Sequence, residues 1–133
     1  MNQDILIPPL LMLPEGLVGL PHIRELQVVP IAGGEFVELV ASGEPGLGWL
    51  AASAEDVRPG MTAALRAGGH VQNDATLLVL LASHGSPAVV TANLAGPIAV
   101  DPEGTARQLV IEDPAYELRV RIGRLAPTPA AQG

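Results

Sequence analysis

The chain has 133 residues, which suits one domain able to bury roughly two-thirds of the surface that its unfolded form exposes. Fourteen acidic residues against seven arginines and no lysine give a formal net charge of -7, which argues against direct binding of RNA or DNA. The absence of cysteine excludes disulfides, a thiolate nucleophile and a cysteine-bound metal.

The N-terminal segment is apolar over residues 5–13 but is interrupted by Pro8, Pro9 and Pro14. Because no positively charged region precedes it, it makes a poor signal peptide. The apolar run 77–82 is far too short to cross a membrane. We therefore expect a cytoplasmic protein without membrane contact.

Short strands are the expected elements throughout, because thirteen prolines and fifteen glycines divide the chain into short segments. Gly16 and Gly19, near the start, are predicted to occupy turns. The first two strands are predicted over 25–31 and 35–41, which are rich in Val and Leu and are bounded by Gly, Pro or acidic residues.

One or two short helices are predicted in the middle of the chain. The first, a possible helical turn, begins at Ser53, because Asp56 follows at the spacing of a capping box. The second takes Pro59 as its first helical position and continues through 61–67, where the residues are mostly good helix formers. The pair Gly68-Gly69 is predicted to end it.

Further strands are predicted over 76–82, 87–93, 97–100, 107–111 and 116–122. The last of these has an apolar residue at every second position, which predicts one buried face and one solvated face. The runs 77–81 and 89–94 lack such alternation, as expected of strands covered on both faces or enclosed in a barrel.

The predicted architecture is mainly β: a small, β-barrel-like or sandwich domain over residues 1–122 with one or two short helices. The tail 123–133 has no apolar period and is expected to be disordered. We expect a monomer, although the sequence does not fix the oligomeric state.

Two motifs give the chain a family resemblance. One is Leu13-Pro14-Glu15-Gly16-Leu17-Val18-Gly19-Leu20, and the other is Thr91-Ala92-Asn93-Leu94-Ala95-Gly96-Pro97-Ile98, followed by Gln108 and Tyr116. Asn93 stands inside an apolar run, so its amide is expected to be hydrogen-bonded. In order and residue type, these motifs resemble those of FliW, the family of bacterial flagellar assembly factors.

The resemblance implies a compact β-barrel-like protein that binds flagellin in the cytoplasm. It also implies binding to CsrA, a basic RNA-binding dimer that represses flagellin translation, with one partner excluding or releasing the other. An acidic surface is compatible with a basic partner, because charge attraction raises the association rate.

Candidate partner-binding residues are three motif positions and three surface acids: Asn93, Pro97, Tyr116, Glu112, Asp113 and Glu117. Tyr116 is the best anchor candidate, because an aromatic ring with a polar tip suits the centre of an interface. For Asn93 and Pro97, a structural role competes with partner contact.

No residue constellation predicts catalysis, a cofactor or a metal. His22, His70 and His84 are widely separated and lack metal-ligand spacing. The acidic pairs Glu55/Asp56, Asp101/Glu103 and Glu112/Asp113 stand in or beside predicted turns, and Gly43–Gly48 is a turn without the lysine of a phosphate loop. We therefore expect no enzyme; the alternatives are a small β-barrel hydrolase or ligand-binding protein using loop histidines and carboxylates, and a structural homo-oligomer.

Overall fold

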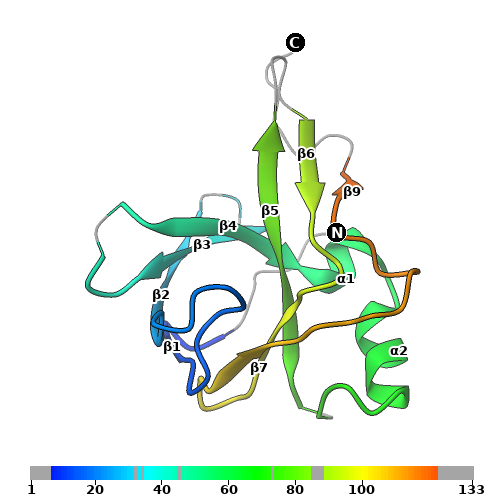
Figure 1. Ribbon diagram of the computed structural model, residues 1–133, viewed down its shortest axis with the longest axis horizontal. Helices are drawn as coiled ribbons and strands as arrows, with labels where there is room; N and C mark the ends of the chain where they lie inside the picture. The colour runs from blue at the N-terminus through cyan, green and yellow to red at the C-terminus, as the bar shows by residue number, and fades with distance from the viewer. Residues whose placement is uncertain are drawn as a thin grey trace.

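Figure 1 shows the computed structural model of the chain. It describes residues 7–31, 33, 35–44, 46–72, 74–84 and 89–122. The predicted tail 123–133 lies outside the described residues.

Nine strands and two short helices make up the described part of the chain. The strands are β1 (Leu10–Met12), β2 (Glu25–Pro30), β3 (Phe36–Ala41), β4 (Gly48–Ser53), β5 (Thr76–His84), β6 (Val89–Ala92), β7 (Ile98–Val100), β8 (Ala106–Gln108) and β9 (Val120–Arg121). The helices are α1 (Ala54–Val57) and α2 (Met61–Ala67), which both lie between β4 and β5.

The strands form one antiparallel sheet that curls into a small, nearly closed barrel. Strands β1 to β5 pair in chain order, and the first part of β5 pairs with β7, which in turn pairs with β8. The barrel closes where the Met12 amide donates to the Gly104 carbonyl at 2.8 Å and Met12 bridges Thr105. The far half of β5 leaves the barrel and pairs with β6, and β6 pairs with β9, as Figure 1 shows. The predicted mainly β, barrel-like fold is thus confirmed.

The interior of the barrel holds one apolar cluster, here called the barrel core. The strand register places alternate residues inside; Leu26, for example, lies opposite Ala41 on the neighbouring strand. The core consists of Leu11, Leu13, Leu17, Ile23, Leu26, Val37, Leu39, Ala41, Ala51, Leu78, Ile98, Val100 and Ala106.

A second apolar cluster lies outside the barrel, and we call it the helix-covered core. It consists of Ala52, Ala54, Met61, Leu65, Leu77, Val79, Leu81, Ala92, Leu94, Leu109 and Ile111. Strand β5 belongs to both clusters, because Leu78 faces the barrel core while Leu77 and Val79 face the other. This explains why the run 77–81 lacks alternation, as predicted for a strand covered on both faces.

The side chain of Glu55 on α1 forms hydrogen bonds to the start of α2. Ser53 Oγ accepts from the Glu55 amide at 3.3 Å and so begins α1, as predicted. The Glu55 carboxylate then accepts from the amides of Gly60 and Thr62, both at 2.8 Å, at the start of α2. Partial burial raises the pKa of Glu55, but these two amides, the Thr62 hydroxyl and Arg66 outweigh that effect, so its pKa lies below the ordinary 4.5.

Helix α2 ends where Gly68-Gly69 predicted. Gly69 has φ of +82°, and the amides of Gly69 and His70 return to the carbonyls of Arg66 and Leu65, which is a Schellman motif. The start of the helix was predicted wrongly, because α2 begins at Met61 and Pro59 lies in the link between the helices.

Several predicted strand bounds were wrong. Residues 116–122 form a strand only at β9, and Leu118 is exposed, because β6 offers β9 only two register partners. The strand predicted over 107–111 ends at Gln108, although Leu109 and Ile111 are buried and donate to the carbonyls of Pro97 and Ala95. Strands β1 and β4 were not predicted.

Candidate protein-interaction surface

Asn93 holds the turn between β6 and β7. Its side-chain Oδ1 accepts from the backbone amides of Ala95 and Gly96, both at 3.0 Å, while its backbone N–H donates to the Leu80 carbonyl at 2.9 Å. The prediction that this amide side chain is hydrogen-bonded is confirmed. The half-buried Asn93 therefore shapes the backbone that presents the second motif.

Gln108 joins the two motifs in space. Its Oε1 accepts from the Val18 amide at 2.9 Å, and its Nε2 donates to the Gly96 carbonyl at 3.0 Å. A Cβ on Gly96 would lie 3.0 Å from the amide nitrogens of Asn93 and Gln108, so a side chain at this position would crowd the junction. Sequence reasoning missed this junction, because the bond from Gln108 to Val18 spans 90 residues.

Pro97 is buried behind this junction. Its carbonyl accepts from the Leu109 amide at 2.8 Å, which fixes the segment that leads away from β8. In the state described, Pro97 contributes to packing and offers no exposed side chain to a partner.

The four remaining predicted residues, Glu112, Asp113, Tyr116 and Glu117, share one loop, residues 112–117. Asp113 shapes it, since its Oδ1 accepts from the Ala115 amide and its carbonyl from the Tyr116 amide, both at 2.9 Å. Tyr116 is half-buried and packs against the helix-covered core.

Arg58, which follows α1, clamps this loop. Its guanidinium donates to the Ala115 carbonyl at 2.6 Å and lies 5.5 Å from the centroid of the Tyr116 ring. This contact spans 57 residues, and no local pattern in the sequence could have predicted it.

Exposed charges border the loop on both sides. Glu112 and Glu117 are exposed, and within the described ranges no hydrogen bond or ion pair engages either side chain. Arg119 and Arg121 are also exposed and follow in the chain, so the loop carries a mixed rim with an exposed acid at each end. Such a rim favours polar contact with a macromolecule.

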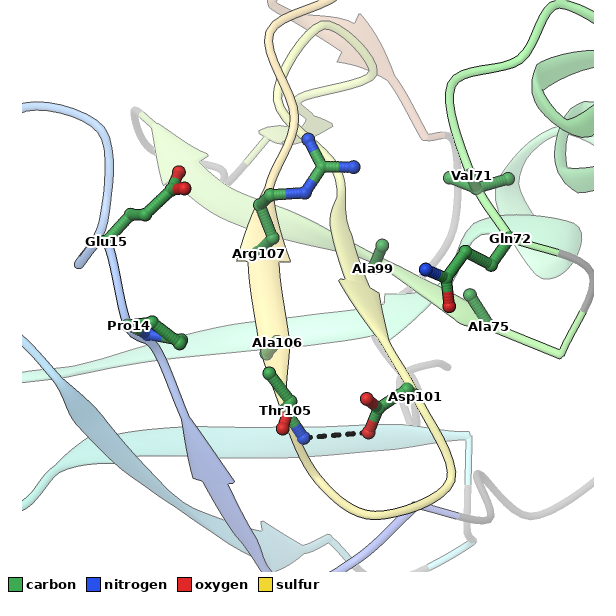
Figure 2. A pocket seen from close by; sticks show the side chains of 10 residues that line it. All are labelled: Pro14, Glu15, Val71, Gln72, Ala75, Ala99, Asp101, Thr105, Ala106 and Arg107. Atoms are coloured by element: carbon green, nitrogen blue, oxygen red, sulfur yellow. Dashed lines mark hydrogen bonds between the residues drawn. The ribbon is translucent and has the colours of Figure 1, made fainter.

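A pocket of about 170 Å³ lies between the first motif, the β7–β8 hairpin and the segment before β5. Figure 2 shows Glu15 on one side and Gln72 on the other, with Arg107 on β8 between them. The carboxylate of Asp101 at the pocket is already occupied, because its Oδ1 accepts from the amides of Glu103 and Thr105 at 3.0 and 2.9 Å. The pocket has room for a small side chain.

Metal-ligating geometry is absent from the described ranges, where no group of three or more His, Cys, Asp or Glu could hold an ion. His22 Nε2 lies 3.3 Å from Glu44 Oε2, both side chains being largely exposed, and His70 is exposed. The side chain of His84 lies outside the described part of the structure. Among the described helices, none has the length and apolar character needed to span a membrane.

Known proteins resemble this chain in both sequence and fold. A family model described as FliW protein matches residues 2–122. A curated relative named "Flagellar assembly factor FliW", from Geotalea uraniireducens (strain Rf4), is 34% identical over 114 residues, which cover 80% of this chain and 70% of the relative. A solved structure titled "Crystal structure of the flagellar assembly factor FliW" superposes with a TM-score of 0.71 at 17% identity and covers 93% of each chain.

Proposed function

This chain belongs to the FliW family, and from that premise we propose that it is a flagellar assembly factor that binds flagellin in the cytoplasm and antagonises the translational repressor CsrA. It acts by binding other proteins and not by catalysis. Flagellin and CsrA exclude one another, so export of flagellin frees the protein to capture CsrA and permits further flagellin synthesis.

The match of the family model to residues 2–122 carries this proposal, because it includes both motifs and the junction that Gln108 makes between them. The curated relative adds the printed role of flagellar assembly factor. The similarity to the solved structure supports the fold alone.

The charge distribution supports a basic partner. The net charge is -7, and the exposed carboxylates of Glu112 and Glu117 stand at the two ends of the loop that Arg58 and Asp113 hold in shape. A preshaped loop loses little conformational entropy on binding. Long-range attraction between its acids and a basic partner raises the association rate and is screened by salt.

Binding of the purified chain to the cognate flagellin and to CsrA, each immobilised separately, tests the proposal. We expect a specific complex with each partner, and saturating flagellin should prevent capture of CsrA. The double variant E112S/E117S should lower the association rate with CsrA several-fold at low salt, and the deficit should shrink as salt rises.

The double variant E15S/E103S is the matched control, because it removes two exposed carboxylates and the same net charge elsewhere. An equal loss in both variants would assign the effect to total charge and not to the loop. A folded wild-type protein that binds neither partner would refute the proposed function.

A further inference from the structure

The outer face of strands β1–β4 carries apolar side chains in two cross-strand rows. In one row Leu10 lies opposite Gln27, which lies opposite Val40. In the other, Val29 lies opposite Glu38, which lies opposite Leu50. Successive residues of a strand point to opposite faces, so these rows lie on the side away from the barrel core.

Apart from the end at Phe36 and Ala52, which pack with the helix-covered core, this outer face is uncovered, in contrast to the outer face of β5. Leu10, Met12, Val29 and Leu50 are 41%, 45%, 42% and 37% exposed. On β5, Leu81 lies opposite Leu50 yet is only 7% exposed, because it belongs to the helix-covered core. The apolar surface therefore continues from the covered half of the sheet onto an open half.

The charges on this face have one sign. The four strands read Leu-Leu-Met, Glu-Leu-Gln-Val-Val-Pro, Phe-Val-Glu-Leu-Val-Ala and Gly-Trp-Leu-Ala-Ala-Ser, and their charged residues are Glu25 and Glu38. Both glutamates alternate with the exposed apolar residues, since Glu25 lies opposite Met12 and Glu38 lies between Val29 and Leu50. An apolar surface with acids and no base favours a complementary ligand.

We propose that the outer face of β1–β4 docks a polypeptide segment of a partner protein in which apolar side chains alternate with lysine or arginine. This inference rests on the proposed function and names the surface through which the basic partner is held. A second copy of this chain is a poor occupant, because a two-fold contact would bring the same glutamates together. An anionic membrane surface is disfavoured for the same electrostatic reason.

The face and the loop have separate kinetic roles. The acids of loop 112–117 act at a distance and set the association rate, whereas desolvated apolar contacts on β1–β4 set the dissociation rate. In Figure 1, β1 and β2 lie on the side of the barrel away from α2 and the segment that leads to β9. The two surfaces can therefore be altered independently.

The experiment compares dissociation of CsrA and of flagellin from the wild-type chain, from V29S/L50S and from E38K. Burial of a leucine or valine side chain makes a difference of about tenfold or more in affinity, so we expect V29S/L50S to dissociate at least about tenfold faster from the basic partner, with its association rate within about twofold of wild type. E38K should weaken the same complex. V110S is the matched control, because Val110 is 64% exposed and lies outside these strands.

Thermal unfolding of each variant verifies that it remains folded. If V29S/L50S does not fold, E38K tests the inference alone, because Glu38 is exposed. Faster dissociation in V29S/L50S together with weaker binding by E38K, and wild-type behaviour of V110S, would support the inference. Suppose that the wild type binds its partners. A dissociation rate of V29S/L50S equal to that of the wild type, or tighter binding by E38K, would then overturn the inference and leave the proposed function intact. A wild-type dimer that V29S/L50S dissociates would replace the proposed occupant with a second copy, and wild-type failure to bind either partner would refute both proposals.

Discussion

The barrel core and the helix-covered core are similar in composition but are built differently. Residues of the barrel core face one another because the strand register and the closure of the sheet place them inside. The helix-covered core needs a lid, made of α1, α2 and residues 109–116 laid over the outer face of β5. Ladder hydrogen bonds support the first, whereas the lid over the second is held by the backbone bonds of Leu109 and Ile111 and by a few side-chain contacts.

Three charged side chains hold the parts of the lid together. Glu55 joins α1 to α2, Arg58 fastens loop 112–117, and Arg66 on α2 donates to the Ala75 carbonyl at 3.1 Å just before β5. Helix α2 has only seven residues and would be marginal without tertiary contacts. We therefore expect the lid, and not the barrel, to be the region that opens locally.

The largest expected effect comes from a cavity in each core. Leu39→Ala should lower the free energy of unfolding by about 3–5 kcal/mol, because a closed barrel cannot collapse around the missing side chain. Leu65→Ala on α2 should cost about 2–3 kcal/mol, since a short helix can shift to fill the space. Urea denaturation of both variants measures the difference, and an equal or larger loss for Leu65→Ala would contradict the comparison.

A smaller difference, about 1–3 kcal/mol, is expected between two glycine variants in the loop after β1, where Gly16 and Gly19 form a matched pair. Both have positive φ, +72° and +80°, as their predicted turn positions require. Gly19→Ala should cost about 1–2 kcal/mol from φ alone, because a Cβ there meets nothing within 4 Å. Gly16→Ala should cost about 1–3 kcal/mol more, because its Cβ would lie 2.3 Å from the Pro21 carbonyl oxygen.

Thermal or urea denaturation of the two glycine variants under identical conditions gives this comparison directly. The difference between them isolates the close approach to Pro21, because the cost of positive φ is common to both. Equal losses would mean that the loop relaxes around the added methyl group.

The smallest expected effect tests the lid. Glu55→Gln should cost about 0.5–1 kcal/mol at neutral pH, the usual size of a helix cap. The folded pKa of Glu55 lies below 4.5, so its ionised form stabilises the wild type above that pH, and this contribution is lost as pH falls through the folded pKa. The gap between variant and wild type in urea midpoints should therefore close as the pH falls below 4.5 and through the folded pKa of Glu55. A gap independent of pH would show that the carboxylate charge does not hold α2.

Local sequence patterns predicted the elements whose cause is local. Ser53 began α1 and Gly68-Gly69 ended α2, because a cap needs only neighbouring residues. Strand β1 was missed because three residues among prolines carry little pattern, and β4 because its alanines have low strand propensity. Apolar residues do alternate over 116–122, but most of this segment has no strand to pair with, because β6 provides partners for only two of its residues.

The candidate site shows the same division. The bonded amide of Asn93 and the turn at Gly16 followed from the type and neighbours of each residue. The Gln108 junction and the Arg58 clamp could not be predicted from the residue pattern, because each joins segments far apart in the chain and depends on how the barrel closes.

The closure of the barrel at β1 also affects whether two copies of the chain can pair through their strand edges. Strand β1 is the apolar sequence Leu-Leu-Met, and an open edge of that kind invites strand addition from another molecule. The Met12 amide donates to the Gly104 carbonyl and so is not free to pair with another strand. This close approach requires glycine at position 104, because a Cβ there would lie 2.8 Å from the Leu10 carbonyl oxygen. The absence of a methyl group at Gly104 thus lets the chain cover its own β1 edge, which we expect to reduce strand addition by another copy at this edge.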